Sequence, residues 1–110
     1  MDDCLFCRIV AGKIPATVVY EDDHVMAIND VFPRAPFHVL VVPRKHVAKL
    51  SDLEDEVLGG RLLQAVRRVA RQAGVRDFRL VVNNGDDAGQ NVLHLHLHVL
   101  GGREFAWPPG

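Results

Sequence analysis

The stretch from residue 94 to residue 100 constrains the fold more than any other part of the chain, because histidine alternates there with an aliphatic residue. Strict alternation with a period of two indicates a half-buried β-strand rather than a helix. We therefore expect a strand over residues 94–100. The residues expected to point into a core are Leu95, Leu97 and Val99. Those expected on the opposite face, roughly 6.6 Å apart, are His94, His96 and His98.

Three histidines on one strand face favour a function. Imidazole is a poor β-former, so a row of three stabilises no ordinary sheet. The isolated His24 is instead interpreted as a hydrogen-bonded spectator. Two kinds of chemistry fit the row: a zinc hydrolase with two histidine ligands and an open metal position, or a nucleophilic site in which a neutral imidazole attacks phosphorus. The spacing alone does not choose between them.

The length and charge of the chain limit the remaining classes. At 110 residues, one domain over residues 1–110 is expected, with a single core. Thirteen basic and 14 acidic residues give a net charge of −1, which offers no electrostatic argument for a nucleic-acid or membrane partner. No basic, apolar leader and no apolar run of ~18 residues is found. We expect a cytoplasmic protein.

Turn and periodicity signals divide the chain into short elements. A short helix is expected within residues 2–12, because Leu5, Phe6, Ile9 and Val10 form an apolar stripe of helical spacing and Gly12 can end the helix. A turn at Asp22-Asp23 joins two strand-like runs. The runs expected to form strands besides 94–100 are 17–21, 24–29, 37–42 and 78–83. The run 37–42 alternates poorly but is mostly β-branched and apolar, as expected of a central strand that is covered on both faces.

A long helix is expected over residues 52–73. Ser51 and Glu54 have the spacing of a capping box, and Gly74 can end the helix. The pair Gly59-Gly60 is interpreted as close packing or a bend. The side chains expected on the buried face are Leu53, Val57, Leu58, Leu62, Val66, Val69 and Ala70. Five strands, one long helix and one short helix indicate an α+β fold with a mostly antiparallel five-stranded sheet.

The only two cysteines, Cys4 and Cys7, have a C-x2-C spacing that allows several interpretations. A disulfide framework is disfavoured in a leaderless chain with two cysteines, and a thioredoxin-like pair would follow a strand. The pair could be half of a tetrahedral zinc site. It could also be two buried, reduced thiols.

Several segments together resemble a known family. Residues 94–100 resemble the His-φ-His-φ-His-φ-φ signature of the histidine triad (HIT) family, and further segments resemble its Hint branch, the purine nucleoside phosphoramidases, in the same order along the chain. These segments are Ile14–Ala16, Glu21–Asp23, Ala35–His38, Val42–His46, Val81–Gly85, Gly89–Gln90, Leu100–Arg103 and Trp107–Gly110. The resemblance covers essentially the whole chain and implies the HIT fold.

The resemblance also implies a reaction. His96 would attack the α-phosphorus of an adenosine or other purine nucleoside 5′-phosphoramidate, and water would hydrolyse the nucleotidyl-histidine intermediate to release AMP, without an organic cofactor. His94 would orient the site through its backbone carbonyl group. The remaining candidate catalytic residues and phosphate donors are His98, Asn83, Gly89, Gln90 and Asn91.

The same resemblance implies binding residues. The purine would lie in an apolar slot, and Asp30 would accept the ribose hydroxyl groups; the slot residues are Leu5, Phe6, Ile9, Ile28, Asn29 and Val31. A structural zinc ion would be bound by Cys4, Cys7, His46 and His94. The tail with Trp107 would reach the site of a partner subunit in a homodimer.

Three departures from the Hint pattern concern substrate choice. Asn91 stands where the branch often has a serine that is thought to help the leaving nitrogen, and Ile28 and Phe32 replace commoner residues near the base and ribose. Other activities therefore remain open: a metallohydrolase, a dinucleoside polyphosphate hydrolase from another branch, or a non-catalytic nucleotide-binding adaptor.

Overall fold

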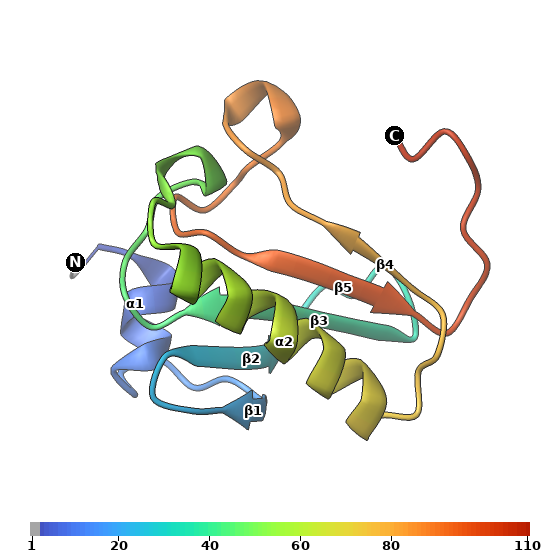
Figure 1. Ribbon diagram of the computed structural model, residues 1–110, viewed down its shortest axis with the longest axis horizontal. Coiled ribbons are helices and arrows are strands. Elements are labelled where there is room, and N and C mark those ends of the chain that lie inside the picture. The colour runs from blue at the N-terminus through green and yellow to red at the C-terminus, as the bar shows by residue number, and fades with distance from the viewer. Residues whose placement is uncertain (1–2) are drawn as a thin grey trace.

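A computed structural model describes residues 3–110 as a five-stranded antiparallel sheet with one helix on each face (Figure 1). The strands are β1 (Val18–Glu21), β2 (Val25–Asn29), β3 (Phe37–Pro43), β4 (Phe78–Val81) and β5 (Leu97–Gly101), and their order in the sheet is β1-β2-β3-β5-β4. The helices are α1 (Leu5–Val10) and α2 (Glu56–Gln72). Two short 3-10 turns cover Leu50–Asp52 and Asp86–Ala88. The predicted α+β class and antiparallel sheet are confirmed.

Alternation along the central strands divides the core into two layers. One set of buried side chains packs against α2 and includes Val25, Ala27, Val39, Val41 and Val99. The intervening residues pack against α1 and include Met26, Ile28, Leu40 and Val42. Strand β3 lies between β2 and β5 and is buried almost throughout, which confirms the prediction of a central strand. Within residues 3–110, no helix is long and apolar enough to cross a membrane.

Helix α2 begins later than the capping box predicted. Its N-cap is Asp55, whose carboxylate accepts a hydrogen bond from the backbone N–H of Leu58 at 3.0 Å. Ser51 lies in the preceding 3-10 turn, where its backbone N–H donates to Asn84 Oδ1 at 2.9 Å. The capping box at Ser51 and Glu54 is therefore wrong, because the local sequence contains a second good cap only four residues later.

The buried face of α2 is largely as predicted. The residues confirmed as buried are Leu58, Leu62, Val66, Val69 and Ala70, joined by Ala65. Val57 is 65% exposed, so its assignment to the core is wrong. The helix continues through Gly59 and Gly60. A Cβ atom on Gly59 would meet only Leu53, at 3.6 Å, and one on Gly60 would meet nothing within 4 Å, so close packing does not explain the pair.

Strand β5 is shorter than the alternation predicted, since it begins at Leu97 and contains only His98 of the three histidines. Upstream of it, the backbone N–H of Leu95 donates to the carbonyl of Val47, in the connection after β3, at 2.6 Å. The ladder with β3 stops because Pro43 ends that strand and has no N–H group. The aliphatic residues nevertheless enter the core as predicted: Leu95, Leu97 and Val99.

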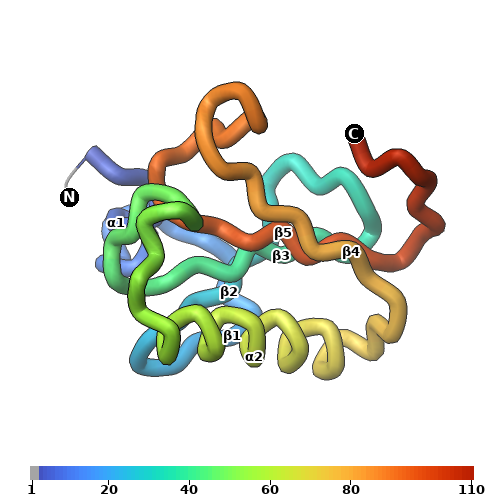
Figure 2. Tube along the Cα trace, turned by 45° about the horizontal axis from the view of Figure 1, so that its top comes forward, coloured from blue at the N-terminus to red at the C-terminus, as the bar shows by residue number. Residues whose placement is uncertain are grey.

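The chain after β5 runs along the end of the sheet that is remote from α1 (Figure 2). The guanidinium groups of Arg79 and Arg103 lie 5.1 and 4.1 Å from the centre of the Phe105 ring. Arg79 also donates a hydrogen bond to the carbonyl of Ala106 at 3.0 Å. Trp107, two residues beyond Phe105, is 82% exposed. The start of the tail is therefore held against the sheet while Trp107 faces outward.

Candidate active site

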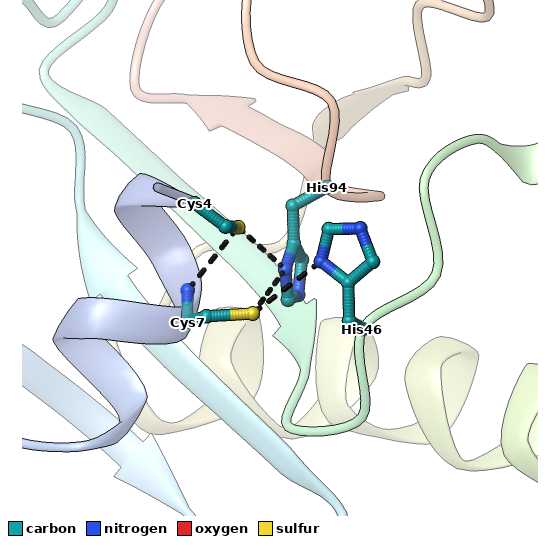
Figure 3. Close-up of side chains that lie close together, drawn as sticks. All are labelled: Cys4, Cys7, His46 and His94. Atoms are coloured by element: carbon teal, nitrogen blue, oxygen red, sulfur yellow. Dashed lines mark hydrogen bonds between the residues drawn. The ribbon is translucent and has the colours of Figure 1, made fainter. Parts of the chain in front are cut away.

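The three histidines of the motif contact two different groups of side chains. His94 lies in a bend before β5, is fully buried and faces Cys4, Cys7 and His46 (Figure 3). The rings of His96 and His98 remain neighbours, with centroids 5.0 Å apart. His94 still lies on the same side of the chain as His96, because the Phe6 ring contacts both rings while Leu95 between them enters the core on the α2 side. The predicted common side is therefore confirmed, but His94 differs from His96 and His98 in its partners, since its ring faces the cysteines.

His96 is held with one ring nitrogen free. Its Nδ1 lies 2.8 Å from the backbone carbonyl oxygen of His94. A carbonyl oxygen can only accept, so the proton of a neutral His96 ring resides on Nδ1. The lone pair is consequently on Nε2, and this nitrogen can act as a nucleophile. The predicted orienting role of the His94 carbonyl group is supported by this contact.

His98 belongs to a hydrogen-bonded chain that fixes its tautomer. The backbone N–H of Arg34 donates to Nδ1 of His38 at 3.0 Å, so the proton of a neutral His38 ring is on Nε2. That Nε2–H donates to Nδ1 of His98 at 2.9 Å, which leaves the proton of His98 on its own Nε2. Asp30 Oδ2 lies 3.3 Å from His38 Nε2 as a second acceptor. A neutral His98 therefore presents a hydrogen-bond donor.

The side chains of Asp30, His38 and His98 each offer a possible metal-ligand atom, and these atoms lie within 4.8 Å of one another. That spacing is compatible with a metal ion as well. The hydrogen bonds already explain the arrangement without a metal ion. His38 Nδ1 accepts from the Arg34 N–H, and the Nε2–H of His38 donates to Nδ1 of His98.

Burial keeps this pair of rings uncharged. Burial, followed by the neighbouring His96 and His38, lowers the pKa of His98 to about 4, while Asp30 acts in the opposite direction. Burial also lowers the pKa of His38, against the effect of Asp30. His98 is therefore neutral near pH 7, and what it presents to the cavity is a hydrogen-bond donor rather than a positive charge.

The lowered pKa of His98 makes stability depend on pH. Its folded pKa of about 4 is below the ordinary 6.5, so between these values the unfolded chain binds a proton that the folded protein does not. The free energy of unfolding should therefore fall as the pH falls from about 6.5 to about 4. The measurement is the urea midpoint at pH 7 and pH 4.5, for wild type and for His98→Asn as control. The variant should lose less stability than wild type between the two pH values, and an equal loss would contradict this assignment.

A cavity of about 300 Å³ lies beside His96 and His98. Its lining is mainly apolar and comes from α1, the segment after it, β2, the connection to β3 and the segment before β5. The predicted site residues that line it are Leu5, Phe6, Ile9, Ile28, Asn29, Asp30, Val31, Asn91, His96 and His98. Asp30 Oδ1 accepts from the backbone N–H of Phe32 at 2.8 Å, which fixes the carboxylate at the start of the turn.

Four predicted nucleotide-binding residues do not line this cavity: Asn83, Gly89, Gln90 and Trp107. The buried Gln90 side chain forms internal hydrogen bonds instead: its amide donates to the carbonyls of Ala48 and Val92, and its oxygen accepts from the N–H of Gly85. Gln90 therefore fixes the loop that carries Asn91. A role in nucleotide binding stays a prediction for these four residues, in phosphate binding for Asn83, Gly89 and Gln90 and at the partner subunit's site for Trp107.

Several residues at the site were not predicted. These additional cavity-lining residues are Ile14, Pro15, Ala16, Leu40 and Val92, and Phe32, which was expected near the base and ribose, lines the cavity as well. His38 is the most important omission because it sets the tautomer of His98. A signal was present: a histidine in an apolar, central strand must find a polar partner. Across β3 and β5, Leu40 pairs with His98 and His38 with Leu100, which makes the two histidines diagonal neighbours.

The four predicted metal ligands converge on one point (Figure 3). Cys4 Sγ lies 3.3 Å from His94 Nδ1, and Cys7 Sγ lies 3.3 Å from His46 Nδ1 and 3.5 Å from His94 Nδ1. All four ligand atoms lie within 4.8 Å of one another. Tetrahedral Zn–S and Zn–N bonds imply S···N separations of about 3.5 Å. The four side chains therefore fit a tetrahedral metal ion.

The hydrogen bonds around the group also prepare it for a cation. His94 Nε2 lies 2.8 Å from the carbonyl oxygen of Pro43, so the lone pair of a neutral ring is on Nδ1, which faces both sulfur atoms. Both cysteines are free thiols. Burial and the neighbouring Cys4 raise the pKa of Cys7, an effect that a bound cation would counteract. The predicted set of ligands is thus assembled by the fold.

Known proteins share both the fold and the motif. The HIT domain family matches residues 11–105, and the chain therefore belongs to the HIT family. It is 52% identical to an uncharacterized HIT-like protein of Synechocystis, over 99% of this chain and 98% of that protein. A HIT family hydrolase from Legionella pneumophila is 45% identical, with a TM-score of 0.95 over 98% of this chain and all of that one. A zinc-bound histidine triad family protein from Mycobacterium smegmatis is 36% identical, with a TM-score of 0.81 over 94% and 77% of the two chains.

Proposed function

We propose that this protein is a hydrolase that cleaves the P–N bond of purine nucleoside 5′-phosphoramidates and releases AMP from adenosine substrates. The observation that carries the proposal is the hydrogen bond from His96 Nδ1 to the His94 carbonyl, which leaves Nε2 free beside a cavity of about 300 Å³. That volume is at the lower end of the range for small-molecule sites. Membership of the HIT family and similarity to solved proteins described as hydrolases support the reaction class.

In the proposed reaction, Nε2 of His96 attacks the α-phosphorus and the P–N bond breaks. The nitrogen leaves as an amine with a proton taken from water, and the hydroxide equivalent then attacks phosphorus. The bond between phosphorus and Nε2 breaks, and its electron pair returns to the ring of His96. Because phosphoryl transfer depends mainly on positioning and charge stabilisation, the Nε2–H of His98 is proposed to donate a hydrogen bond to a phosphate oxygen throughout.

The apolar part of the cavity is proposed to receive the purine. Ile9 and Ile28 come from different elements and line the same cavity, which is how two sides of a flat base can be covered. Asp30 lines it as well, and its Oδ2 is a candidate acceptor for the ribose hydroxyl groups. Asn91 is proposed to contact the phosphate or the leaving amine.

The metal ion is proposed to be zinc, bound by Cys4, Cys7, His46 and His94. The two thiols and two imidazoles are the donor set that zinc prefers, and four protein ligands leave no open coordination position. The ion would therefore be structural and would connect α1 to the segments that carry His46 and His94. The zinc-bound relative from Mycobacterium smegmatis supports the choice of metal.

The test is AMP release from adenosine 5′-phosphoramidate by the purified protein, with and without a chelator. Turnover that survives brief chelation supports the histidine nucleophile. Turnover at saturating substrate that is lost while the protein stays folded, and that returns with added metal, would instead indicate a metallohydrolase. Tight AMP binding without turnover would indicate a nucleotide-binding adaptor, and turnover of dinucleoside polyphosphates alone would indicate the other HIT activity.

A homodimer is proposed for the functional protein, with the tail of each subunit reaching the site of its partner. The support is that Trp107 is 82% exposed and lies outside the cavity of its own chain. Phe78 and Leu80 on the edge strand β4 are also partly exposed, at 39% and 36%. Light scattering should give twice the mass of a 12.2 kDa chain, and a monomeric mass would reject the proposal.

A further inference from the structure

Helix α1 links the metal ligands to the nucleotide cavity. Its N-cap is Cys4, whose sulfur accepts from the backbone N–H of Cys7 at 3.4 Å, and Cys7 lies in its first turn. The two residues between these ligands, Leu5 and Phe6, both line the cavity beside His96. Metal binding and base binding therefore use neighbouring side chains of one turn of helix.

The opposite wall of the cavity is tied to the same ligands. His94 offers Nδ1 to the sulfur atoms, and its carbonyl accepts from His96. The ring of Phe6 fills the space between the two sites, with its centroid 5.7 Å from the His94 ring and 5.2 Å from the His96 ring. Phe6 is only 4% exposed. A displacement of α1 would therefore disturb the base slot and the surroundings of the nucleophile together.

Helix α1 has little stability of its own. It contains six residues, whereas isolated helices below roughly 12–15 residues are marginal in water. It packs on the face of the sheet opposite α2, in the smaller core cluster with Met26, Ile28, Leu40 and Val42. The larger cluster around α2 contains no residue of α1. Loss of the metal is therefore expected to loosen α1 while the sheet and α2 remain folded.

We infer that occupancy of the site formed by Cys4, Cys7, His46 and His94 controls the affinity of the cavity for a purine nucleotide, through the position of α1 and Phe6. This inference rests on the proposed function, since it assumes that the cavity binds the nucleotide. Binding linkage is reciprocal: if the metal strengthens nucleotide binding, the nucleotide strengthens metal binding by the same factor. The protein would then retain its metal most firmly while nucleotide is bound.

The experiment measures both sides of this linkage. AMP affinity is measured by calorimetry on zinc-loaded and chelator-stripped protein, and zinc affinity is measured against a chromophoric chelator with and without saturating AMP. We expect stripping to raise the Kd for AMP by about 5- to 150-fold, the usual range for coupled sites. AMP should tighten zinc binding by an equal factor. Circular dichroism should show that the sheet and α2 stay folded after stripping.

Three variants make the result specific. Cys4→Ser combined with Cys7→Ser should have the AMP affinity of the stripped protein whether or not zinc is added. His24→Ala, which changes an exposed histidine on the β1–β2 turn, should respond to zinc like wild type. Phe6→Leu keeps all four ligands, so it can be studied in the zinc-loaded state. It should reduce the factor by which AMP tightens zinc binding.

The failures are distinguishable. Equal AMP affinity in loaded and stripped protein would overturn the inference and leave the proposed function intact. An unchanged linkage factor in Phe6→Leu would overturn the role of that side chain, even if stripped protein does not stay folded. AMP binding in neither form would overturn the proposed function, and the inference with it.

Discussion

His96→Ala should abolish turnover while leaving the fold and both binding sites in place. Removing a covalent nucleophile that acts with other groups costs on the order of 10⁶-fold in kcat in a well-studied protease, and we expect a loss of at least about 10⁴-fold here. Among residues 3–110, the ring of His96 packs against Phe6 and His98 and donates one hydrogen bond, to the backbone carbonyl of His94, so its removal takes a donor from that carbonyl but leaves no buried side chain without a partner.

Single-turnover kinetics on adenosine 5′-phosphoramidate measure this loss directly. His24→Ala is the matched control, because it removes an exposed histidine far from the cavity lining. His96→Ala should still bind AMP, and it should bind zinc like wild type, because the four metal ligands and the other cavity-lining residues are kept. Turnover within tenfold of wild type would rule out His96 as the nucleophile.

His98→Val should lower kcat by about 10²- to 10³-fold, the usual cost of removing one preorganised donor from a developing anion. Valine suits a strand and lacks the Nε2–H that His38 holds in place through the hydrogen bond to Nδ1. Because the pKa of His98 is lowered to about 4, the loss should come from a missing hydrogen bond and not from a missing acid.

Two substrates distinguish a donor to the phosphate oxygen from an acid that protonates the leaving group. A phosphoramidate has a poor leaving group that needs a proton, whereas the p-nitrophenyl ester of AMP has a good one that does not. If His98 donates to a phosphate oxygen, His98→Val should lower the turnover of both substrates by a similar factor. His98→Asn retains an N–H donor, so it should recover part of the lost turnover. A loss confined to the phosphoramidate would show that His98 instead protonates the leaving nitrogen.

Much of the sheet could be predicted because burial leaves a periodic record in the sequence. The buried face of α2 was identified from its helical period and is confirmed except at Val57, whereas the run 37–42 was identified from its mostly continuous apolar character and is confirmed as a buried central strand. The same logic overestimated the length of β5, which begins at Leu97 and not at residue 94. A period of two reports side chains that alternate between the two sides of the backbone, and the backbone before β5 keeps this alternation while the Leu95 N–H pairs with the Val47 carbonyl instead of a strand. The pattern alone cannot distinguish these two backbone partners.

The candidate site was predictable only in part, for physical reasons that differ between its residues. Cys4, Cys7, His46 and His94 are far apart in sequence, so their convergence was inferred from family resemblance and not from spacing. Gln90 was expected to bind an anion, but the sequence does not show that its amide is occupied by Ala48 and Val92. His38 was missed because a lone histidine in an apolar strand resembles an ordinary core residue.

The double use of His94 has a consequence for mutagenesis. Its ring faces the cysteine sulfur atoms, but its backbone carbonyl holds the nucleophile. Every coded substitution at this position changes the ring and keeps the carbonyl group. A saturation scan would therefore underestimate His94, because the hydrogen bond to His96 is made by the peptide unit and not by the side chain. Replacing the His94–Leu95 amide with a backbone ester weakens that carbonyl as an acceptor. Because the ester also removes the Leu95 N–H that donates to the Val47 carbonyl, its effect on turnover has to be compared with its effect on stability.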